Sequence, residues 1–249
     1  MTAPPHKQAK THYTRMGNLT SPGSSKTRRQ RMDDAKDPLD RKLKSYIETT
    51  YSPIPRDEQE RIIDNVISLI ELAQDKKQNS RSIMDHVAKM IFRLFSFDEI
   101  AVGLRDRRSG VYRYEVLFGY RKEVIDKFRR IEYSYHDMVS YDRFPNVKIG
   151  RLSEFNPVEG LPEREKDLYD RPLIISQKRT GPDDFHEGDY IDVWMYDYRK
   201  DLIGWIELSR PRSGKLPPRT AIRWIELIAS ISASIVAHRW AEEDLGRKI

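Results

Sequence analysis

The residues best suited to chemistry gather in the segment 181–189, GPDDFHEGD, which contains Asp183, Asp184, His186, Glu187 and Asp189. Carboxylates and an imidazole can bind hard or borderline metal ions. The segment lacks the spacing of a calcium-binding loop, and the ligands of a metal must converge in space. We therefore interpret it as a solvated acidic loop that leads into a strand, and we expect no metal site.

The sequence carries no recognisable catalytic motif. It contains no cysteine, which excludes thiolate catalysis, disulfides and cysteine-bound zinc. The six histidines are scattered, and phosphate-loop, nucleophile-elbow and His-Glu-x-x-His patterns are absent. We expect no catalytic residues and a protein that is not an enzyme. A hydrolase or redox enzyme is the weakest alternative.

Aromatic side chains with polar tips are better candidates for a binding site. Strand alternation in 190–196 places Ile191, Val193 and Met195 on one side, and Tyr190, Asp192, Trp194 and Tyr196 on the other. The second set suits a pocket with apolar walls and a few hydrogen-bonding groups. The alternative is that the aromatics form ordinary core and that His136 is a surface or core histidine. The expected ligand-binding residues are Tyr114, Phe118, Tyr133, His136, Trp194 and Tyr196.

Hydrophobic periodicity predicts the elements that hold these residues. Helical spacing indicates helices near 56–74, from Ser82 with Asp85 as its capping-box partner, within 121–131, and from about Pro218 to Glu243. Alternation indicates strands in 99–104 and in 111–120, where it places Tyr112, Tyr114, Val116 and Phe118 on one side. Short strands are expected at 147–152 and 172–176, and a hairpin near 190–197 and 202–209.

This order of elements predicts an α+β fold. Strands joined by short turns form an antiparallel sheet, here of about five to six strands. Helices at both ends of the chain can cover one face of that sheet. The N- and C-terminal helices are therefore expected on one face, which leaves the other face free to enclose a ligand.

Two stretches of the chain resemble a GAF domain, a relative of the PAS sensor fold. They are SIMDHVAKMIFRLFSFDEIAVGLRDRRSGVYRYEVLFGY from Ser82 and LIGWIELSRPRSGKLPPRTAIRWIELIASISASIV from Leu202. The resemblance implies a six-stranded antiparallel sheet, helices on one face, a small-molecule pocket on the other, a regulatory role and frequent dimers. The cysteines of bilin-binding and methionine-sulfoxide-reducing relatives are absent, and so is an intact Asn-Lys-x-x-x-Phe-Asp-Glu motif. None of those activities carries over.

Charge separates the first part of the chain from the rest. Residues 1–44 contain eleven Lys or Arg and four Asp, a net charge of +7, whereas the whole chain is +6 and 45–249 therefore sums to about −1. We expect a disordered basic tail in 1–44, an amphipathic helix and linker in 45–79, and a GAF-like domain in 80–249. The tail could make a weak nucleic-acid contact through KTRRQR, or it could be a solubilising extension.

No window of the sequence reads as a secretory signal, and none approaches the roughly 20 apolar residues of a membrane span. We therefore expect a soluble, cytoplasmic protein with no membrane association.

The last helix has two apolar stripes, and the sheet can cover only one of them. The helix near 56–74 or a second subunit could cover the other, and we expect both contacts, with a homodimer through Ile62–Ala73 and Trp224–Val236. The predicted function is a non-enzymatic sensory or regulatory domain that binds an unidentified small ligand and signals through its terminal helices or a partner. The alternative is a dimeric interaction scaffold with a filled core, whose basic tail contacts nucleic acid or an acidic partner. The stripes are Ile222, Ile225, Ala229, Ser232, Val236 and Trp224, Leu227, Ile228, Ile231, Ile235.

Overall fold

The computed structural model describes residues 38–50, 54, 57–140, 146–160 and 178–246. The chain divides into two compact units, 1–54 and 55–249. In the first unit the structure describes helix α2 (Pro38–Thr50), so the end of the segment expected to be disordered is helical. The strand expected at 172–176 lies outside the described residues, as does most of the basic tail. The rest of the fold belongs to the second unit.

Three long helices flank the sheet region in sequence, and their caps explain where two of them begin. Helix α3 (Glu58–Gln74) begins after Asp57, whose side chain accepts a hydrogen bond from the Glu60 amide at 2.9 Å. Helix α4 (Ser80–Phe95) begins after Asn79, whose side chain caps the Ser82 amide at 2.8 Å. The predicted start at Ser82 was therefore wrong, because the capping residue is Asn79, three residues earlier. Helix α8 spans Arg219–Gly246.

The sheet has seven strands in the order β3-β2-β1-β7-β6-β5-β4, and every neighbouring pair is antiparallel. The predicted antiparallel architecture is confirmed, with a strand count above the expected five to six because β3 and β4 are two-residue strands in a segment without clear periodicity. Two short helices, α5 (Lys122–Phe128) and α6 (Tyr135–Val139), and the 3-10 turn η1 (Val158–Gly160) complete the unit. The strands are β1 Phe97–Arg105, β2 Tyr112–Phe118, β3 Glu132–Tyr133, β4 Val147–Lys148, β5 Ser153–Asn156, β6 Tyr190–Tyr196 and β7 Leu202–Pro211.

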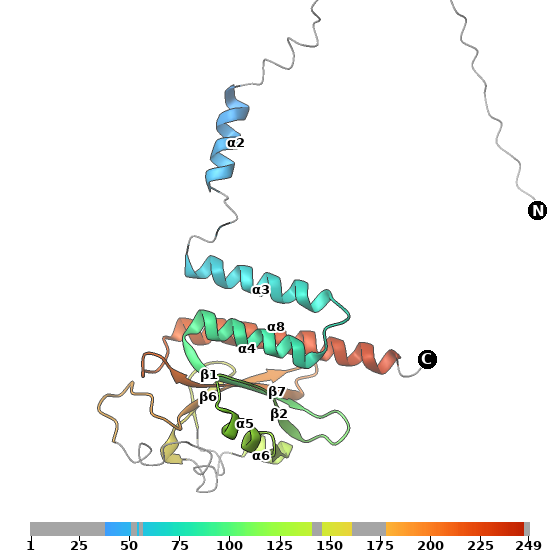
Figure 1. The fold of residues 1–249 in the computed structure, drawn as a ribbon, viewed down its shortest axis with the longest axis vertical. Helices are drawn as coiled ribbons and strands as arrows, with labels where there is room; N and C mark the ends of the chain where they lie inside the picture. Colours follow the sequence, from blue (N-terminus) through green and yellow to red (C-terminus); the bar gives the residue numbers. More distant parts are fainter. Residues whose placement is uncertain (1–37, 51–53, 55–56, 141–145, 161–177, 247–249) are drawn as a thin grey trace, which may run out of the picture. The chain divides into compact units, whose positions relative to one another are not determined.

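Helices α4 and α8 pack on one face of the sheet, and α3 lies on their outer side (Figure 1). The main core lies between the sheet and these helices, and α3 contributes Ile62 and Leu69 to it. The buried Arg239 of α8 donates hydrogen bonds from Nη2 to the carbonyl oxygens of Ala73 and Asp75, at 2.6 and 3.0 Å. This arginine therefore satisfies carbonyls at the end of α3 and fastens α3 to α8.

Helix α8 overturns one expectation, because it contains a window of mean hydropathy 1.4 that is long and apolar enough for a membrane span, with 44% of that window buried. Its first predicted stripe is buried throughout, including Ile222, Ile225 and Val236. Packing against the sheet and α4 accounts for the apolar character of that stripe. The second stripe is only half buried at Trp224, and Leu227 is exposed.

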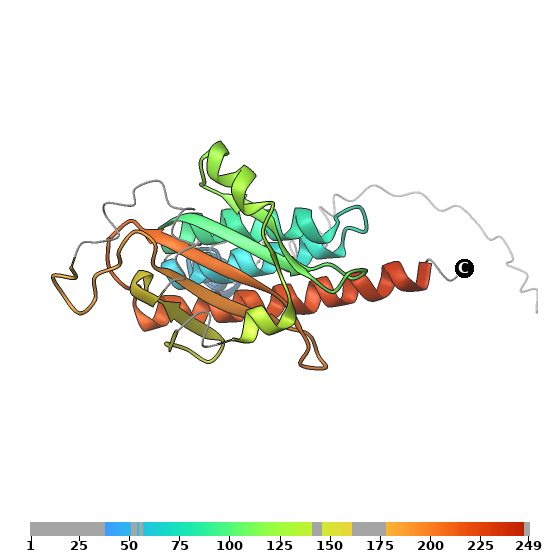
Figure 2. The same cartoon turned by 90° about the horizontal axis from the view of Figure 1, so that it is seen from below.

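The opposite face of the sheet, hereafter the second face, carries its own smaller core. Figure 2 views this face, with the long helices behind the strands. Val124 and Phe128 of α5 pack there against Tyr112, Tyr114 and Trp205. The second face is therefore partly covered by short helices, which the sequence pattern placed in the chain but not on this face.

A bulge in β2 divides its side chains between the two faces. Val116 pairs with Val102, but Tyr114 pairs with Gly103, so one residue of β2 is extra at this point. The expectation that all four alternating residues of β2 share a side was wrong, because a bulge inverts the alternation beyond it. Tyr114 lies on the second face, whereas Phe118 packs on the helix side, edge-on against Phe92 of α4 with ring centroids 5.0 Å apart.

Candidate functional site

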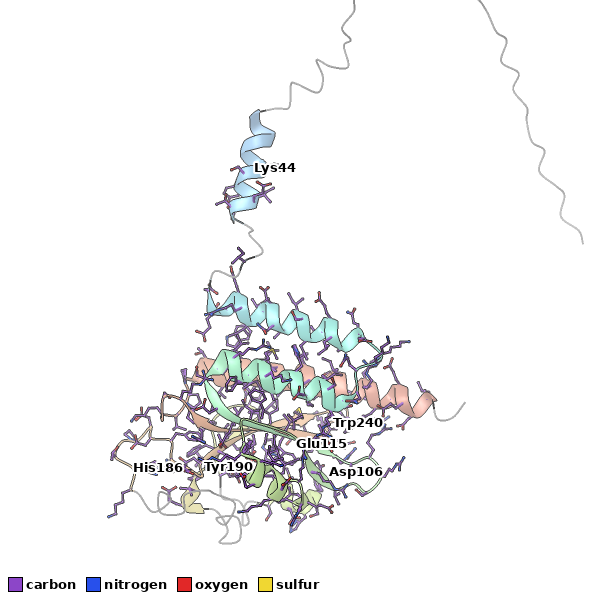
Figure 3. The ribbon with its side chains drawn as sticks, in the orientation of Figure 1. Lys44, Asp106, Glu115, His186, Tyr190 and Trp240 are labelled. Atoms are coloured by element: carbon purple, nitrogen blue, oxygen red, sulfur yellow. The ribbon has the colours of Figure 1, made fainter. Side chains whose placement is uncertain are left out.

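A small cavity of about 40 Å³ opens on the second face. This volume gives room for roughly three water molecules. Side chains of β2, β3, β5, β6 and β7 line it, together with Met138 of α6. Tyr190, labelled in Figure 3, lies on this side of the sheet, away from α4 and α8. The aromatic lining residues are Tyr114, Tyr133, Tyr190, Trp194 and Trp205, and the polar ones are Ser140, Asn146, Asn156, Asp192 and Glu207.

One wall of the cavity is a cluster of aromatic rings. The ring of Trp205 lies 5.1 Å from that of Tyr114 and 6.0 Å from that of Tyr133, both in edge-on orientation. Gly103 of β1 makes this possible, because a Cβ atom at that position would meet the six-membered ring of Trp205 at 2.0 Å. The wall is therefore built by side chains of β2, β3 and β7.

The floor of the cavity is acidic. Glu154 of β5 is the register partner of Asp192 of β6, and Asp192 is the register partner of Glu207 of β7. Directly opposed residues of neighbouring strands point to the same face. Asp192 is 8% exposed and Glu207 is 6% exposed. We call Glu154, Asp192 and Glu207 the carboxylate row.

Glu207 is held by phenol groups. The hydroxyl of Tyr114 donates to Glu207 Oε2 at 2.8 Å, and the hydroxyl of Tyr120 donates to Oε1 at 3.4 Å. Burial raises the pKa of Tyr114, and the nearby Glu207 charge raises it further. The Tyr114 phenol is therefore protonated at neutral pH and remains a hydrogen-bond donor to this carboxylate.

Among the described residues, the carboxylate oxygens of Asp192 have fewer hydrogen-bond donors than those of Glu207. The side-chain amide of Asn156 donates to its Oδ2 at 3.1 Å. Its Oδ1 is buried and has no hydrogen-bond partner among the residues that the structure describes. Burial raises the pKa of Asp192 well above the ordinary value, and the charges of Glu207 and Glu154 add to this effect, while the Asn156 bond opposes it. A hydrogen-bond donor inside the cavity would satisfy this oxygen.

The structure brings together half of the residues that the sequence singled out. Tyr114, Tyr133 and Trp194 line the cavity. The alternation predicted for 190–195 agrees with the structure, because Tyr190, Asp192 and Trp194 line the cavity and the residues between them belong to the helix-side core.

Three predicted residues lie elsewhere. Phe118 is on the helix side because of the β2 bulge. His136 is exposed on the short helix α6. Tyr196 is 40% exposed and follows a register shift after Met195, so it does not continue the alternation. Phe118 and Tyr196 were predicted from a regular strand alternation that the fold does not keep. His136 was predicted from its position in the chain.

The sequence analysis placed Asp192 on the pocket side of its strand but not among the expected ligand-binding residues, and it did not single out Asn156, Trp205 and Glu207 as site residues. The hairpin of β6 and β7 offered a partial signal, because Asp192 and Glu207 are acids in otherwise apolar strands. Counting back from the turn does not pair them, because the register shifts by one residue between Met195 and Tyr196. Asn156 had no such signal, because β5 is four residues long and lies in a segment without clear periodicity.

Side chains of the acidic loop 181–189 form hydrogen bonds and ion pairs with neighbouring residues. Asp184 accepts from Lys215 Nζ at 2.6 Å and from the hydroxyl of Thr180 at 2.7 Å, and these bonds hold its pKa below the ordinary value, with Lys215 the main cause. Asp189 accepts from the Val158 amide and from Arg179, at 2.9 and 2.8 Å. Within the described ranges, no group of three His, Asp or Glu side chains is arranged to hold a metal ion.

No family model matches the chain, and no curated protein matches it. Several solved GAF-domain structures are similar to it. The GAF domain/HD domain protein from Geobacter sulfurreducens has 17% identity over 70% of this chain and 98% of its own, with a TM-score of 0.48. The GAF domains of the phosphoenolpyruvate-protein phosphotransferases from Acinetobacter and Coxiella burnetii have 11% and 10% identity over 72% and 74% of this chain and 94% and 97% of theirs, with TM-scores of 0.46 and 0.47.

The class of protein follows from the architecture itself. An antiparallel sheet has the long helices α4 and α8 on one face and a small cavity on the other. This is the arrangement that the resemblance implied. The chain has a GAF-like α+β fold, and the predicted fold class is confirmed.

Proposed function

We propose that the chain is a non-enzymatic sensory or regulatory domain that binds a small ligand in the cavity of the second face. The observation that carries the proposal is Asp192, a buried carboxylate that lines the cavity with one oxygen lacking a partner among the described residues. Leaving a buried polar atom unpaired costs about 1–3 kcal/mol. A ligand that donates a hydrogen bond would recover that cost on binding.

The interaction scaffold is the second candidate, and the ring contacts of Tyr114, Tyr133 and Trp205 favour it, because they show that part of the second face is filled. A filled face gives no ligand response. The nucleic-acid contact of this candidate would belong to residues 1–44, and it would weaken with salt and disappear when those residues are deleted.

Strand β5 offers a route from the cavity to the long helices. At one end its Asn156 contacts Asp192 in the cavity. At the other end, Ser153 Oγ and the Leu152 amide donate to Oε1 of the buried Glu226 of α8, at 2.9 and 2.6 Å. We propose that a ligand at Asp192 shifts β5 and, through Glu226, shifts α8 and the α3 that Arg239 fastens to it.

The outer surface of α3 is the proposed contact for a second copy of the chain. Ile63, Ile67 and Ile70 follow helical spacing and are exposed, while Ile62 and Leu69 face inward. The stripe can pack on the same stripe of another copy about a twofold axis. The half-buried second stripe of α8 extends the proposed interface, as the homodimer prediction for 62–73 and 224–236 requires.

A ligand screen tests the proposed function. The full chain is exposed to small metabolites that include cations, neutral compounds and anions, and the melting temperature is recorded. At least one compound is expected to raise it progressively with concentration, as binding to the folded state alone requires. Trp194→Leu removes part of the cavity wall and should abolish the shift, whereas Tyr198→Leu, on the exposed hairpin turn, should not. A folded protein that responds to no compound would contradict the proposal.

A further inference from the structure

The charged residues that the structure describes around the cavity are acidic, without a basic counterpart. Among the described lining residues none is Lys, Arg or His, while two are buried carboxylates, Asp192 and Glu207. Like charges that face each other on neighbouring strands are destabilising, and burial increases the cost. Phenol donors offset the cost for Glu207, and Asn156 offsets it for one oxygen of Asp192. Asp192 Oδ1 remains buried without a donor among the described residues, in a side chain that lines the cavity.

The aromatic wall suits the same kind of guest as the acidic floor. Rings of Trp194, Trp205, Tyr114 and Tyr133 surround the volume next to Asp192. A cation within about 6 Å of an aromatic ring face is attracted by the ring quadrupole, most strongly by tryptophan. A carboxylate on one side and indole and phenol rings on the other therefore attract positive charge together.

The shape of the site distinguishes an organic cation from a metal ion. Calcium takes about six to eight oxygen ligands, and magnesium demands an octahedral set. The described cavity offers two carboxylates and amide or hydroxyl groups among many carbon atoms. An alkylammonium group needs only a few acceptors and uses its carbon atoms against the rings. The volume of about 40 Å³ limits the enclosed part to a small head group.

We propose that the cavity binds a small primary ammonium group, whose N–H donates to Asp192 Oδ1 while the rings of Trp194 and Trp205 enclose its carbon atoms. This proposal rests on the proposed function and narrows its ligand to one chemical class. It makes the carboxylate row the element that selects charge. It also gives Asp192, which strand alternation placed on the pocket side, the specific role of binding the ammonium group.

The two cavity tryptophans provide a local readout. The chain contains four tryptophans, of which Trp194 and Trp205 line the cavity and Trp224 and Trp240 lie on α8. In the full chain labelled with nitrogen-15 at the indole, each gives one N–H resonance, assigned by single replacement with phenylalanine. Propylammonium, propanol and propionate are then titrated at matched ionic strength. They have similar carbon chains and differ in head group and charge.

Propylammonium is expected to move the Trp194 and Trp205 resonances saturably, with an affinity about tenfold or more above that of propanol, since a charge-assisted hydrogen bond contributes about 1.5–3 kcal/mol. Propionate should leave both unchanged. Asp192→Asn keeps the size of the side chain and removes its charge, and it should weaken propylammonium binding about tenfold or more. Asp64→Asn, on the exposed side of α3, should bind as the unchanged protein does.

Other outcomes would overturn the proposal in distinguishable ways. An equal response to propanol or propionate, or a response to calcium or magnesium chloride without one to propylammonium, would reject the ammonium class while leaving a ligand-binding cavity. Binding that survives in Asp192→Asn would reject the role of Asp192. A protein whose cavity tryptophans respond neither to these probes nor to any compound of the metabolite screen would overturn both this proposal and the proposed function.

Discussion

On the second face, the free-energy cost of burying an incompletely hydrogen-bonded carboxyl group falls on Asp192. The residue is 8% exposed and has Glu154 and Glu207 as register partners, and among the described residues its carboxyl accepts one hydrogen bond, from Asn156 to Oδ2. Replacement of such a group at an ordinary core position by a neutral side chain of the same shape often stabilises a protein. A binding site is where a protein tolerates this kind of cost.

The pH dependence of stability tests this cost at the level of the residue. Because the folded pKa of Asp192 lies above the ordinary value of 3.8, the folded state holds its proton at pH values where the unfolded chain has released it. Its contribution to the free energy of unfolding therefore falls as pH rises from about 4 to the folded pKa. Asp192→Asn lacks this fall. The free energy of unfolding of Asp192→Asn, relative to that of the unchanged protein, should therefore grow by about 1.4 kcal/mol for each pH unit across this range.

Urea unfolding of both proteins between about pH 4 and pH 9 measures the difference, in a range set by ordinary carboxyl pKa values and by neutral pH. Asp64→Asn is the matched control, because the same chemical change is made on an exposed part of α3. A difference between Asp192→Asn and the unchanged protein that stays constant with pH would show that the buried carboxyl is not destabilising in the folded state.

The strands show how far local pattern predicts an element and where it stops. The hairpin of β6 and β7 was predicted almost to the residue, because its apolar alternation and polar turn are local features. The β2 bulge was not, because Glu115 is extra only with respect to β1, whose partner residues are distant in sequence. That single insertion decides which aromatic side chains of β2 reach the cavity.

Helix α3 makes a second prediction, at the scale of the element. Arg239→Met keeps much of the apolar stem but removes both hydrogen bonds to the carbonyls of Ala73 and Asp75. A hydrogen bond from a charged donor contributes about 1.5–3 kcal/mol, so without these two bonds the end of α3 should open more often. Hydrogen exchange should then become faster in α3 than in α4. Arg93→Met is the control, since Arg93 is exposed and bonds only within α4.

If the exchange of α3 in Arg239→Met equals that in Arg93→Met, Arg239 does not fasten α3 to α8. The proposed path from the cavity through β5 and α8 would then end at α8.

At the scale of the whole molecule, the fold has three layers: sheet, α4 with α8, and α3 (Figure 1). The layer order was predictable, because hydrophobic stripes at both ends of the chain must cover a sheet face. The cavity was only partly predictable. Its aromatic wall follows from alternation in single strands, whereas the carboxylate row exists only once β5, β6 and β7 are in register.

The outer layer predicts the oligomeric state. Ile67→Asp places a charge in the middle of the exposed apolar stripe of α3, and a symmetric interface meets that charge twice. The protein is expected to be dimeric, and the variant monomeric, by light scattering coupled to size exclusion. Val147→Asp, on the exposed edge strand β4, should leave the mass unchanged. A monomeric starting protein, or a variant that remains dimeric, would remove α3 from the interface.

We propose that the buried Asp192 carboxylate, whose Oδ1 has no hydrogen-bond partner among the described residues, binds a positively charged donor. The side-chain carbonyl carbon of Asp192, followed by carbon-13 NMR as pH is varied, tests this directly. The groups facing it are Glu154 on β5, Glu207 on β7, Tyr114 on β2, Tyr133 on β3 and Tyr190 on β6. Asp192 should titrate above the usual range for aspartate in the free protein, and propylammonium should lower that pKa. An ordinary pKa that propylammonium leaves unchanged would contradict the account.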